Sequence, residues 1–335
     1  MRDLLLVALL VPLLTIGTCW LLGVSPWFGL YAAVAVHLIV LAGIFHPAPS
    51  WVCPTVTRGP PGVPAVALTF DDGPSPTATP AVLEILARFR AQATFFCIGR
   101  AARRYPKLVR AIVEAGHEVA NHSYRHPRHV YLWNARQLAR DTRLAQRALL
   151  RAARTAGWEP QASACADPRG LKPSARPSAP TQWVPCGEAA AARPLTGRRS
   201  RGRRTVAAPT QGAAGVTLEL YRPPIGFRSL SMARTMRRLG LRVVNFSLRS
   251  RDTGSINPNA LLRRLQRRIR PGAIVVFHDG SDVDPRPDRS VLLAVLPPFL
   301  EHLQRQGLQA CSVSALLEGK PGLTPAFCDT ASGAS

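Results

Sequence analysis

VALTFDDGP, residues 66–74, joins a short apolar run to two adjacent carboxylates and a Gly-Pro pair. The run Val66–Phe70 has the length and composition of a buried strand. Two carboxylates at the end of such a strand are costly to bury unless a positive charge neutralises them, which a metal ion can do. Taken alone, Asp-Asp-Gly-Pro is also typical of a simple turn, because each of these residues favours turns. The residues at the ends of the other expected strands decide between a turn and a metal site.

Strand-like and helix-like stretches alternate along the chain from Val63 onward. Strands are expected at residues 66–70, 94–98, 118–120, 217–221, 242–247, 273–277 and 308–311, and helices at residues 80–90, 101–115, 135–154, 229–239, 259–269 and 291–305. Repeated strand–helix units predict an α/β fold with a parallel sheet covered by helices. If such a sheet closes into a barrel, its functional side chains gather at the carboxyl ends of the strands.

Ionisable residues stand at the ends of several of these strands. His122 and His126 come after the third strand, and their four-residue spacing lets both rings face one point where the chain turns helically. Two imidazoles and a carboxylate form a three-ligand metal site that leaves positions open for water and substrate. Arg222 comes directly after the fourth strand, and His278 and Asp279 come after the sixth. Packing does not explain polar groups at the ends of so many apolar strands, so we interpret them as one metal-dependent active site.

At these residues the sequence resembles the polysaccharide deacetylase family, also called the NodB-homology family or carbohydrate esterase family four. The likeness runs from about Val63 to Leu317. The segments that match the family's motifs are TFDDGP at residues 69–74, NHSYRHP at 121–127, RPPIG at 222–226, RDT at 251–253 and VFHD at 276–279. Two positions depart from the common pattern: Ile225 stands where many members have Tyr, and Thr253 where Trp is common.

The resemblance implies a distorted (β/α)7 barrel of NodB-homology type that holds one divalent metal ion, usually zinc. Carried over residue by residue, it implies that Asp72, His122 and His126 bind the metal and that Asp71 is the general base. The metal would polarise the acyl carbonyl and lower the pKa of a water molecule, and Asp71 would take the proton of that water as it attacks.

Further residues receive roles from the same resemblance. Arg222 orients Asp71, and His278 is the general acid that protonates the departing amine. Asp252 supports the charged pair around Arg222 or His278. The backbone N–H of Ile225 is the oxyanion donor, so the exchange of Tyr for Ile spares the chemistry. The implied reaction is hydrolysis of a carbon–nitrogen bond, which removes an N-acetyl or related N-acyl group from an amino sugar of an envelope polysaccharide or a lipid-linked glycan.

Two apolar segments lie near the beginning of the sequence, at residues 4–24 and 29–45. Each is close to the roughly 20 residues that a helix needs to cross a bilayer. A cleaved signal peptide fits less well, because Arg2 is offset by Asp3 and no small-x-small cleavage site comes after the first segment. We therefore expect a membrane anchor, and we favour two transmembrane helices over a single one.

The chain divides into four parts on this interpretation. They are the membrane anchor at residues 1–46, a linker at 47–62, the NodB-like domain at 63–320 and a C-terminal tail at 321–335. The anchor would place the protein in the cell (inner, cytoplasmic) membrane and make the membrane a partner, and the side that the domain faces stays open. Within the domain, residues 155–215 have nine basic and three acidic side chains and little apolar periodicity, which predicts a basic low-complexity insertion. A glycan- or lipid-binding loop is the alternative.

The net charge of +24 comes from 43 basic residues, of which all but three are Arg. The chain has no interleaved aromatics, zinc finger or recognition-helix pattern, so no nucleic-acid partner is expected. Attraction to an anionic glycan or lipid fits the charge better. Two alternatives to an enzyme remain: a non-catalytic glycan- or anionic-membrane-binding protein on the same scaffold, and a basic membrane-surface or nucleic-acid binder that acts through 155–215. His278 argues against the first, because a pure binder has no use for a general acid.

Overall fold

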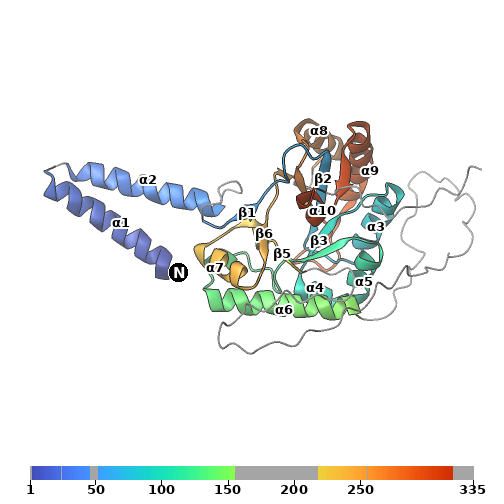
Figure 1. Ribbon diagram of the computed structural model, residues 1–335, viewed down its shortest axis with the longest axis horizontal. Helices are drawn as coiled ribbons and strands as arrows, with labels where there is room; N and C mark the ends of the chain where they lie inside the picture. The colour runs from blue at the N-terminus through green and yellow to red at the C-terminus, as the bar shows by residue number, and fades with distance from the viewer. Residues whose placement is uncertain (1, 24, 46–51, 155–217, 255, 320–335) are drawn as a thin grey trace, which may run out of the picture. The chain divides into compact units, whose positions relative to one another are not determined.

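One sheet of parallel strands organises the domain, and its strand order is β1-β6-β5-β4-β3-β2-β8-β7, with β9 also paired to β2 (Figure 1). The computed structural model describes residues 2–23, 25–45, 52–154, 218–254 and 256–319. The strands are β1 Thr55–Val56, β2 Ala65–Asp71, β3 Thr94–Cys97, β4 Glu118–Asn121, β5 Leu220–Tyr221, β6 Arg242–Val244, β7 Leu248–Arg249, β8 Ile274–His278 and β9 Gln309–Cys311. The predicted parallel α/β sheet is confirmed.

The sheet is a half-barrel, where the resemblance implied a distorted (β/α)7 barrel. Within the described residues, no strand pairing joins β1 to β7, the two ends of the strand order. The stretch 242–247, predicted as one strand, changes partners instead. β6 pairs with β1 and β5, whereas the Ser247 N–H donates to the Ile274 carbonyl and β7 pairs with β8. The hydrogen-bond ladder is therefore interrupted where the chain passes from one neighbour to the other.

Strand β2 is the centre of the sheet and is buried along its whole length. Its second half lies between β3 and β8, and its first half pairs with β9. The Phe70 ring stacks on Phe95 and Phe277 from those two neighbours, with centroids 4.9 and 5.9 Å away. Burial of each such side chain contributes about 1.5–3 kcal/mol. This packing fixes the carboxyl end of β2, where Asp71 lies beside His278 in the strand register.

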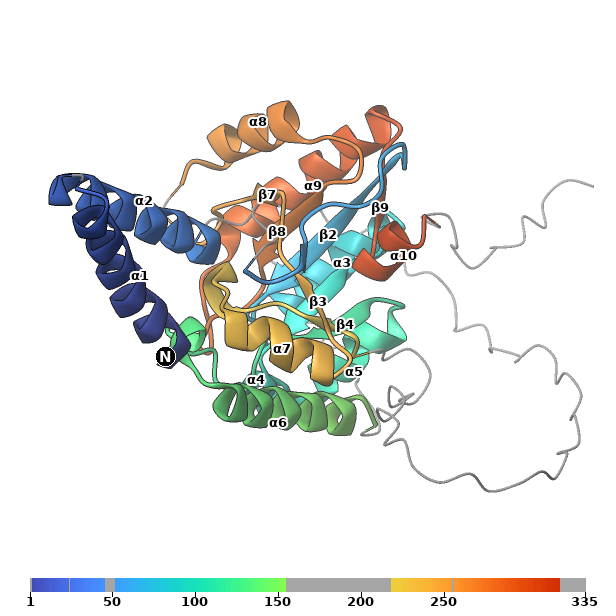
Figure 2. The ribbon, with the colours of Figure 1, turned by 60° about the vertical axis from the view of Figure 1, so that its left-hand side comes forward.

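Helices cover the sheet, and their apolar faces complete the core. They are α3 Thr79–Arg88, α4 Gly99–Arg104, α5 Pro106–Glu114, α6 Ala135–Arg154, α7 Leu230–Arg238, α8 Pro258–Arg268, α9 Ser290–Arg305 and α10 Val313–Leu317, with 3-10 turns at Val130–Leu132 and Pro224–Gly226. α8 and α9 pack together at one end of the sheet, and α4, α5 and α6 pack together at the other (Figures 1 and 2). The main core cluster draws residues from α3, α5, α8 and α9.

Several elements differ in length from the sequence prediction. The helix expected at 101–115 is two helices, because Pro106 has no N–H and disfavours helical geometry at the residue before it. Tyr105, with φ −125° and ψ 59°, separates α4 from α5. The strand expected at 217–221 is only two residues long in the described part of the chain. β1, β7 and α10 were not predicted, because so few residues show no periodicity.

α1 (Arg2–Leu21) and α2 (Pro26–Phe45) form where the two apolar segments were predicted, and they pack against each other. Gly29 permits the close contact, since a Cβ there would lie 3.1 Å from the Ile16 Cα. In the part of the chain that the structure describes, no helix has both the length and the apolar character needed to cross a bilayer. The predicted transmembrane helices and membrane partner are therefore not supported, and the membrane localisation stays an untested prediction.

Two of the predicted parts lie outside the described residues. They are the insertion at 155–215 and the tail at 321–335. The stretch expected to be a linker, 47–62, is described from Val52 onward, and it contains β1, which pairs in parallel with β6.

Candidate active site

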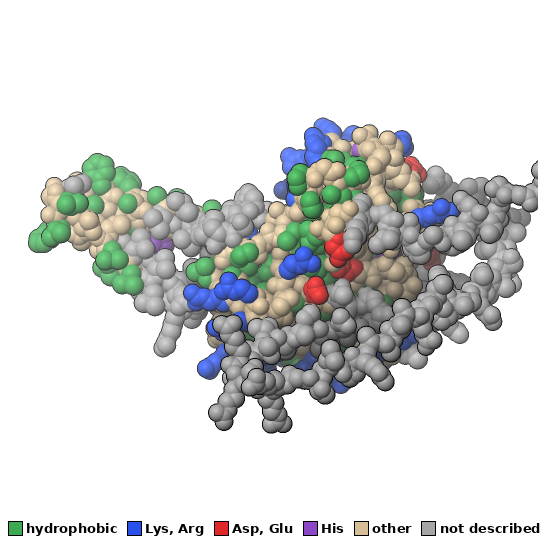
Figure 3. All heavy atoms as spheres, viewed as in Figure 1, with side chains coloured by type: hydrophobic (Ala, Val, Ile, Leu, Met, Phe, Trp, Pro, Cys, Tyr) green, Lys and Arg blue, Asp and Glu red, His purple; other side chains and the backbone are tan. Residues whose placement is uncertain are grey.

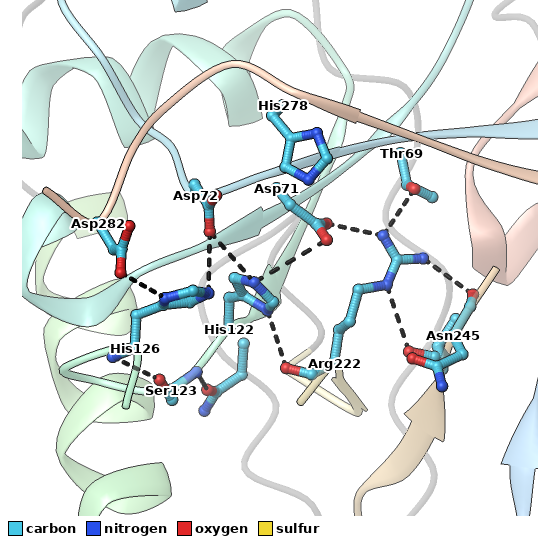
Figure 4. Close-up of polar contacts among 12 residues, drawn as sticks. Thr69, Asp71, Asp72, His122, Ser123, His126, Arg222, Asn245, His278 and Asp282 are labelled. Carbon is cyan, nitrogen blue, oxygen red and sulfur yellow. Dashed lines mark hydrogen bonds and ion pairs between the residues drawn. The ribbon is translucent and has the colours of Figure 1, made fainter. Parts of the chain in front are cut away.

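The carboxyl ends of four strands meet at one cavity of about 540 Å³. β2 ends at Asp71, with Asp72 next in the chain, and β8 ends at His278. His122 comes directly after β4, and Arg222 comes directly after β5 (Figure 4). Because the strands are parallel, their carboxyl ends lie at the same edge of the sheet. The structure thus brings together the side chains that the sequence predicted from separate strands.

Asp72, His122 and His126 form a candidate metal site. One ligand atom from each residue lies within 4.8 Å of the others. Asp72 Oδ1 is 3.1 Å from His126 Nε2 and 3.4 Å from His122 Nε2. That oxygen is buried and has no hydrogen-bond partner among the described residues. A buried acceptor beside two imidazole nitrogens fits a divalent cation, and one carboxylate with two imidazoles is a donor set that zinc accepts.

The carboxyl group of Asp72 is held in its ionised form. Burial alone would raise its pKa, but the close approach of His122 and the charges of His122 and His126 lower the pKa far below the ordinary value for Asp. An ionised carboxylate is the form that binds a metal.

The second nitrogen of each histidine ring lies close to an oxygen atom. His122 Nδ1 donates to the Arg222 carbonyl at 2.9 Å. His126 Nδ1 lies 3.2 Å from Asp282 Oδ2, off the line of a full hydrogen bond, and Arg128 Nε is 3.7 Å from the same oxygen. A proton on Nδ1 leaves the Nε2 lone pair free to face the metal position, so these contacts select the ligating form of both rings.

Asp71 is held by a fully buried arginine. Arg222 Nη1 donates to Asp71 Oδ1 at 2.7 Å and to the Thr69 hydroxyl at 2.7 Å. Nη2 donates to the Asn245 carbonyl at 3.0 Å, and the guanidinium carbon lies 4.0 Å from the centre of the Phe96 ring. Because a planar guanidinium with several partners has little freedom, it fixes one oxygen of Asp71. The other, Oδ2, lies on the side of His122 Nε2, at 3.9 Å.

His278 lines the same cavity, beside Asp71 in the strand register, and is paired with the carboxylate of Asp252. Asp252 Oδ1 accepts from His278 Nδ1 at 2.8 Å, and Asp252 Oδ2 accepts from the His278 backbone N–H at 2.9 Å. The structure thus places Asp252 with His278; the sequence had left open whether it supports His278 or Arg222. Burial alone would lower the pKa of His278, but the hydrogen bond and charge of Asp252 outweigh it and raise that pKa. His278 therefore keeps its proton to higher pH, as a general acid requires.

Strained backbone gathers around the site. Asp72, Ser123, His126 and Ile225 have φ of 69°, 65°, 55° and 62°, a region that residues with a side chain rarely adopt. Local hydrogen bonds hold the histidine loop in this shape: the His126 N–H donates to the Ser123 hydroxyl, and the Ser123 N–H donates to Asn121 Oδ1. Such strain persists only where the surroundings impose it, and it is frequent at active sites.

Ile225 lines the cavity, as the predicted oxyanion position requires. The turn that carries it is held by the residue after β6, because Asn245 Nδ2 donates to the Gly226 carbonyl at 3.1 Å. Thr253, which replaces the family's common Trp, lines the same cavity.

A buried carboxylate joins the loops after β2 and β8. Asp279 Oδ2 accepts from the Thr79 hydroxyl at 2.5 Å, and burial raises the pKa of Asp279 to about 7. Gly73 lies against this carboxylate so closely that a Cβ there would be 2.4 Å from its oxygens. The glycine of the FDDG segment is therefore needed for space beside Asp279.

Sequence reasoning missed three residues of the site: Thr69, Asn245 and Asp282. Thr69 lies two residues before Asp71, so strand alternation puts both on one face and was a usable signal. Asn245 interrupts the apolar residues at 243–246, which was a weaker signal. No spacing singled out Asp282, which reaches the site through the fold of the loop after β8.

Residues 58–160 match the family model for polysaccharide deacetylases. The chitooligosaccharide deacetylase of Sinorhizobium fredii is 30% identical over 230 residues, which cover 69% of this chain and 79% of that protein. The peptidoglycan-N-acetylglucosamine deacetylase of Bacillus cereus is 28% identical over 257 residues, covering 76% of this chain and 89% of that protein.

Solved structures show the same fold. A CE4 family pseudoenzyme from Bacillus anthracis superposes with a TM-score of 0.55 at 20% identity, over 78% of this chain and 68% of that chain. At this identity the likeness concerns the fold alone. Whether the fold carries an activity has to be argued from the side chains of the site.

Proposed function

Because this chain belongs to the polysaccharide deacetylase family, we propose that it is a metal-dependent amide hydrolase that removes an N-acyl group from an amino sugar. The metal ion is divalent and is zinc by preference, held by Asp72, His122 and His126. The observation that supports this most is that Asp71, His278 and the triad line one cavity. A base, an acid and a metal position are the groups that amide hydrolysis needs.

A divalent ion bound at the triad supplies a Lewis acid, which polarises the acyl oxygen and makes water more acidic. Asp71 accepts the proton of the attacking water through Oδ2, since Oδ1 is engaged by Arg222. The backbone N–H of Ile225 donates to the oxyanion that forms, and a single donor of this kind is worth about 2.7–4 kcal/mol.

His278 completes the reaction by protonating the amine. Its Nδ1 is engaged by Asp252, so Nε2 is the atom that delivers the proton. Without this proton the amine is a poor leaving group and the carbon–nitrogen bond does not break. Asp252 stabilises the charged imidazole before the transfer and orients the ring.

We infer the substrate class from the two relatives, whose names refer to chitooligosaccharides and to N-acetylglucosamine of peptidoglycan. The proposed substrate is an N-acetylated amino sugar of an envelope polysaccharide, with a lipid-linked glycan as the second possibility. Ile225 and Thr253 line the cavity in place of two aromatic residues. The sugar therefore has fewer stacking contacts here, which favours a short glycan segment over a long one.

The proposal is tested by activity of the purified full-length protein on a panel of N-acetyl and N-formyl amino sugars, both free and lipid-linked. Each reaction is run after chelation and again after addition of zinc. Release of acetate or formate that depends on zinc supports the proposal, and the preferred sugar identifies the glycan. The proposal is wrong if no member of the panel releases acid with any divalent metal.

The competing function is glycan binding without catalysis, since the same fold occurs in a pseudoenzyme. The two are separated by titrating the zinc-loaded protein with chitooligosaccharide. A binder shows saturable binding without acid release, whereas an enzyme releases acid at concentrations near its binding constant.

A further inference from the structure

A groove between α6 and α7 lies outside the active site and is lined by arginines. Its volume is about 650 Å³, and its arginines are Arg136, Arg140, Arg143, Arg147 and Arg238. The remaining lining residues are small or apolar: Ala135, Ala139, Leu144, Thr235 and Leu239. The two helices lie side by side in both ribbon views (Figures 1 and 2). Basic side chains are visible over α7 and the adjoining end of α6 (Figure 3).

The arginines of α6 form one stripe. Arg136, Arg140, Arg143 and Arg147 succeed each other at intervals of four, three and four residues, which places them on one face of a helix. Between the first and the last the helix rises about 17 Å. The acidic residue of α6, Asp141, is buried away from the stripe and accepts from the Tyr124 backbone N–H at 2.7 Å.

Nothing in the described part of the chain neutralises this stripe. No carboxylate lines the groove, and its five arginines make no ion pair with a described residue. All five side chains are exposed. Like charges three and four residues apart on a helix repel one another, so an anion in the groove would relieve that repulsion. Planar guanidinium groups also bind phosphate and carboxylate through paired hydrogen bonds.

We propose that the α6–α7 groove binds a linear polyanion, a flexible chain that carries phosphate or carboxylate groups at regular intervals. A groove with charges spaced along its edge fits a chain better than it fits a flat bilayer surface. A nucleic acid fits less well, because no aromatic side chain lines the groove and single strands bind largely by stacking on such rings.

Helix α6, which lines the groove, also contacts the loop that carries His122 and His126. The Ser231 hydroxyl at the start of α7 donates to the Trp133 carbonyl just before α6, at 2.8 Å. Asp141 in α6 holds the backbone of Tyr124, which lies between the ligands His122 and His126. The groove and the loop between His122 and His126 therefore share α6 as a supporting helix. Binding to the groove does not rest on the proposed deacetylase function.

The test compares two triple variants of the full-length protein that lose the same charge. The groove variant is Arg140→Gln, Arg143→Gln and Arg147→Gln. The control variant is Arg263→Gln, Arg267→Gln and Arg268→Gln, three exposed arginines of α8 outside the groove lining. Binding of fluorescent inorganic polyphosphate and of polygalacturonate is measured by anisotropy at low and at physiological ionic strength.

We expect the groove variant to bind at least one probe about tenfold or more weakly, with a shallower salt dependence, and the control to stay within about twofold of the parent. The probe that binds more tightly shows whether the groove prefers phosphate or carboxylate groups. Equal losses in the two variants, or binding by neither probe, would overturn the proposal. Groove-dependent binding to phosphatidylglycerol vesicles or to a single-stranded oligonucleotide, stronger than to both probes, would also overturn it in favour of that partner.

Thermal unfolding and hydrolysis of an uncharged N-acetylglucosamine oligomer are measured on both variants. We expect both to match the parent, because no substituted residue lines the active-site cavity. If polyanion binding is lost while this hydrolysis is retained, the groove is separate from the chemistry. If the parent binds polyanion but hydrolyses nothing, the proposed function fails and the groove stands.

Discussion

Asp282→Asn is expected to weaken metal binding without removing a ligand. The substitution keeps the shape of the side chain and removes the charge that faces His126 Nδ1. Loss of such an outer partner typically costs 10–100-fold in metal affinity, equivalent to about 1.4–2.7 kcal/mol. Without the Asp282 carboxylate, no negative charge favours a proton on His126 Nδ1, which is the form of the ring that leaves Nε2 free for the metal.

The structure places the expected effect at the lower end of that range, at about tenfold. The contact is 3.2 Å long and off the hydrogen-bond line, and the Asp282 side chain is 18% exposed. An amide oxygen in the variant can still accept from Nδ1. The other histidine is unaffected, because His122 Nδ1 donates to the backbone carbonyl of Arg222, which no side-chain substitution removes.

The assay is competition for zinc between the protein and a chromogenic chelator, at fixed pH. The matched control is Asp284→Asn, in the same loop and the same cavity lining, where the carboxylate accepts from the Arg286 backbone N–H and contacts no ligand. Asp282 does not orient His126 if the zinc affinities of the two variants are equal.

Four other substitutions or deletions test the remaining parts of the site. Asp71→Asn should retain zinc but lose about 10²–10⁴-fold in kcat, because Asn cannot take a proton; a kcat within tenfold of the parent would remove Asp71 as the base. Asp252→Asn should shift the alkaline limb of the kcat profile to lower pH, since Asp252 is what raises the pKa of His278 and a lower pKa deprotonates the acid sooner. If the alkaline limb does not move, Asp252 does not control the pKa of the proposed acid. Gly73→Ala should cost about 1–3 kcal/mol in urea unfolding, because its Cβ would lie 2.4 Å from a buried carboxylate; unchanged stability would mean that the loops give way. Replacing residues 155–215 by a short Gly/Ser linker should leave zinc content and kcat on a small substrate intact, as the segment supplies none of the proposed groups; a folded, zinc-loaded but inactive variant would make it part of the active site.

The grouping of the proposed ligands could be predicted because they come after apolar strands. Asp72 and His122 stand just beyond buried runs, and the fold rule for parallel strands brings such positions to one edge. The same rule located Arg222 and His278. It needed only the order of strands and helices, not their exact bounds.

The parts that were not predicted depend on contacts distant in sequence. Residues 242–247 were predicted as one strand, and their sequence gives no sign that the chain changes neighbours within it. The pairings of β6 and β7 and the hydrogen bond from Ser247 to Ile274 show that it does. The polar loop after β8 contains three nearby aspartates, at 282, 284 and 288, and the sequence does not show which of them contacts His126. Which of them turns toward His126 is decided by the path of the loop after β8.

Arg222 contacts both Asp71 and His122, which have separate roles in the proposed reaction. Its guanidinium holds Asp71, while its carbonyl accepts the hydrogen bond of His122. A small shift at the end of β5 would move the proposed proton acceptor and a proposed metal ligand together, so neither can be adjusted there alone. Adaptation to a new substrate is therefore easier from the loop after β8, where residues line the cavity without touching both groups.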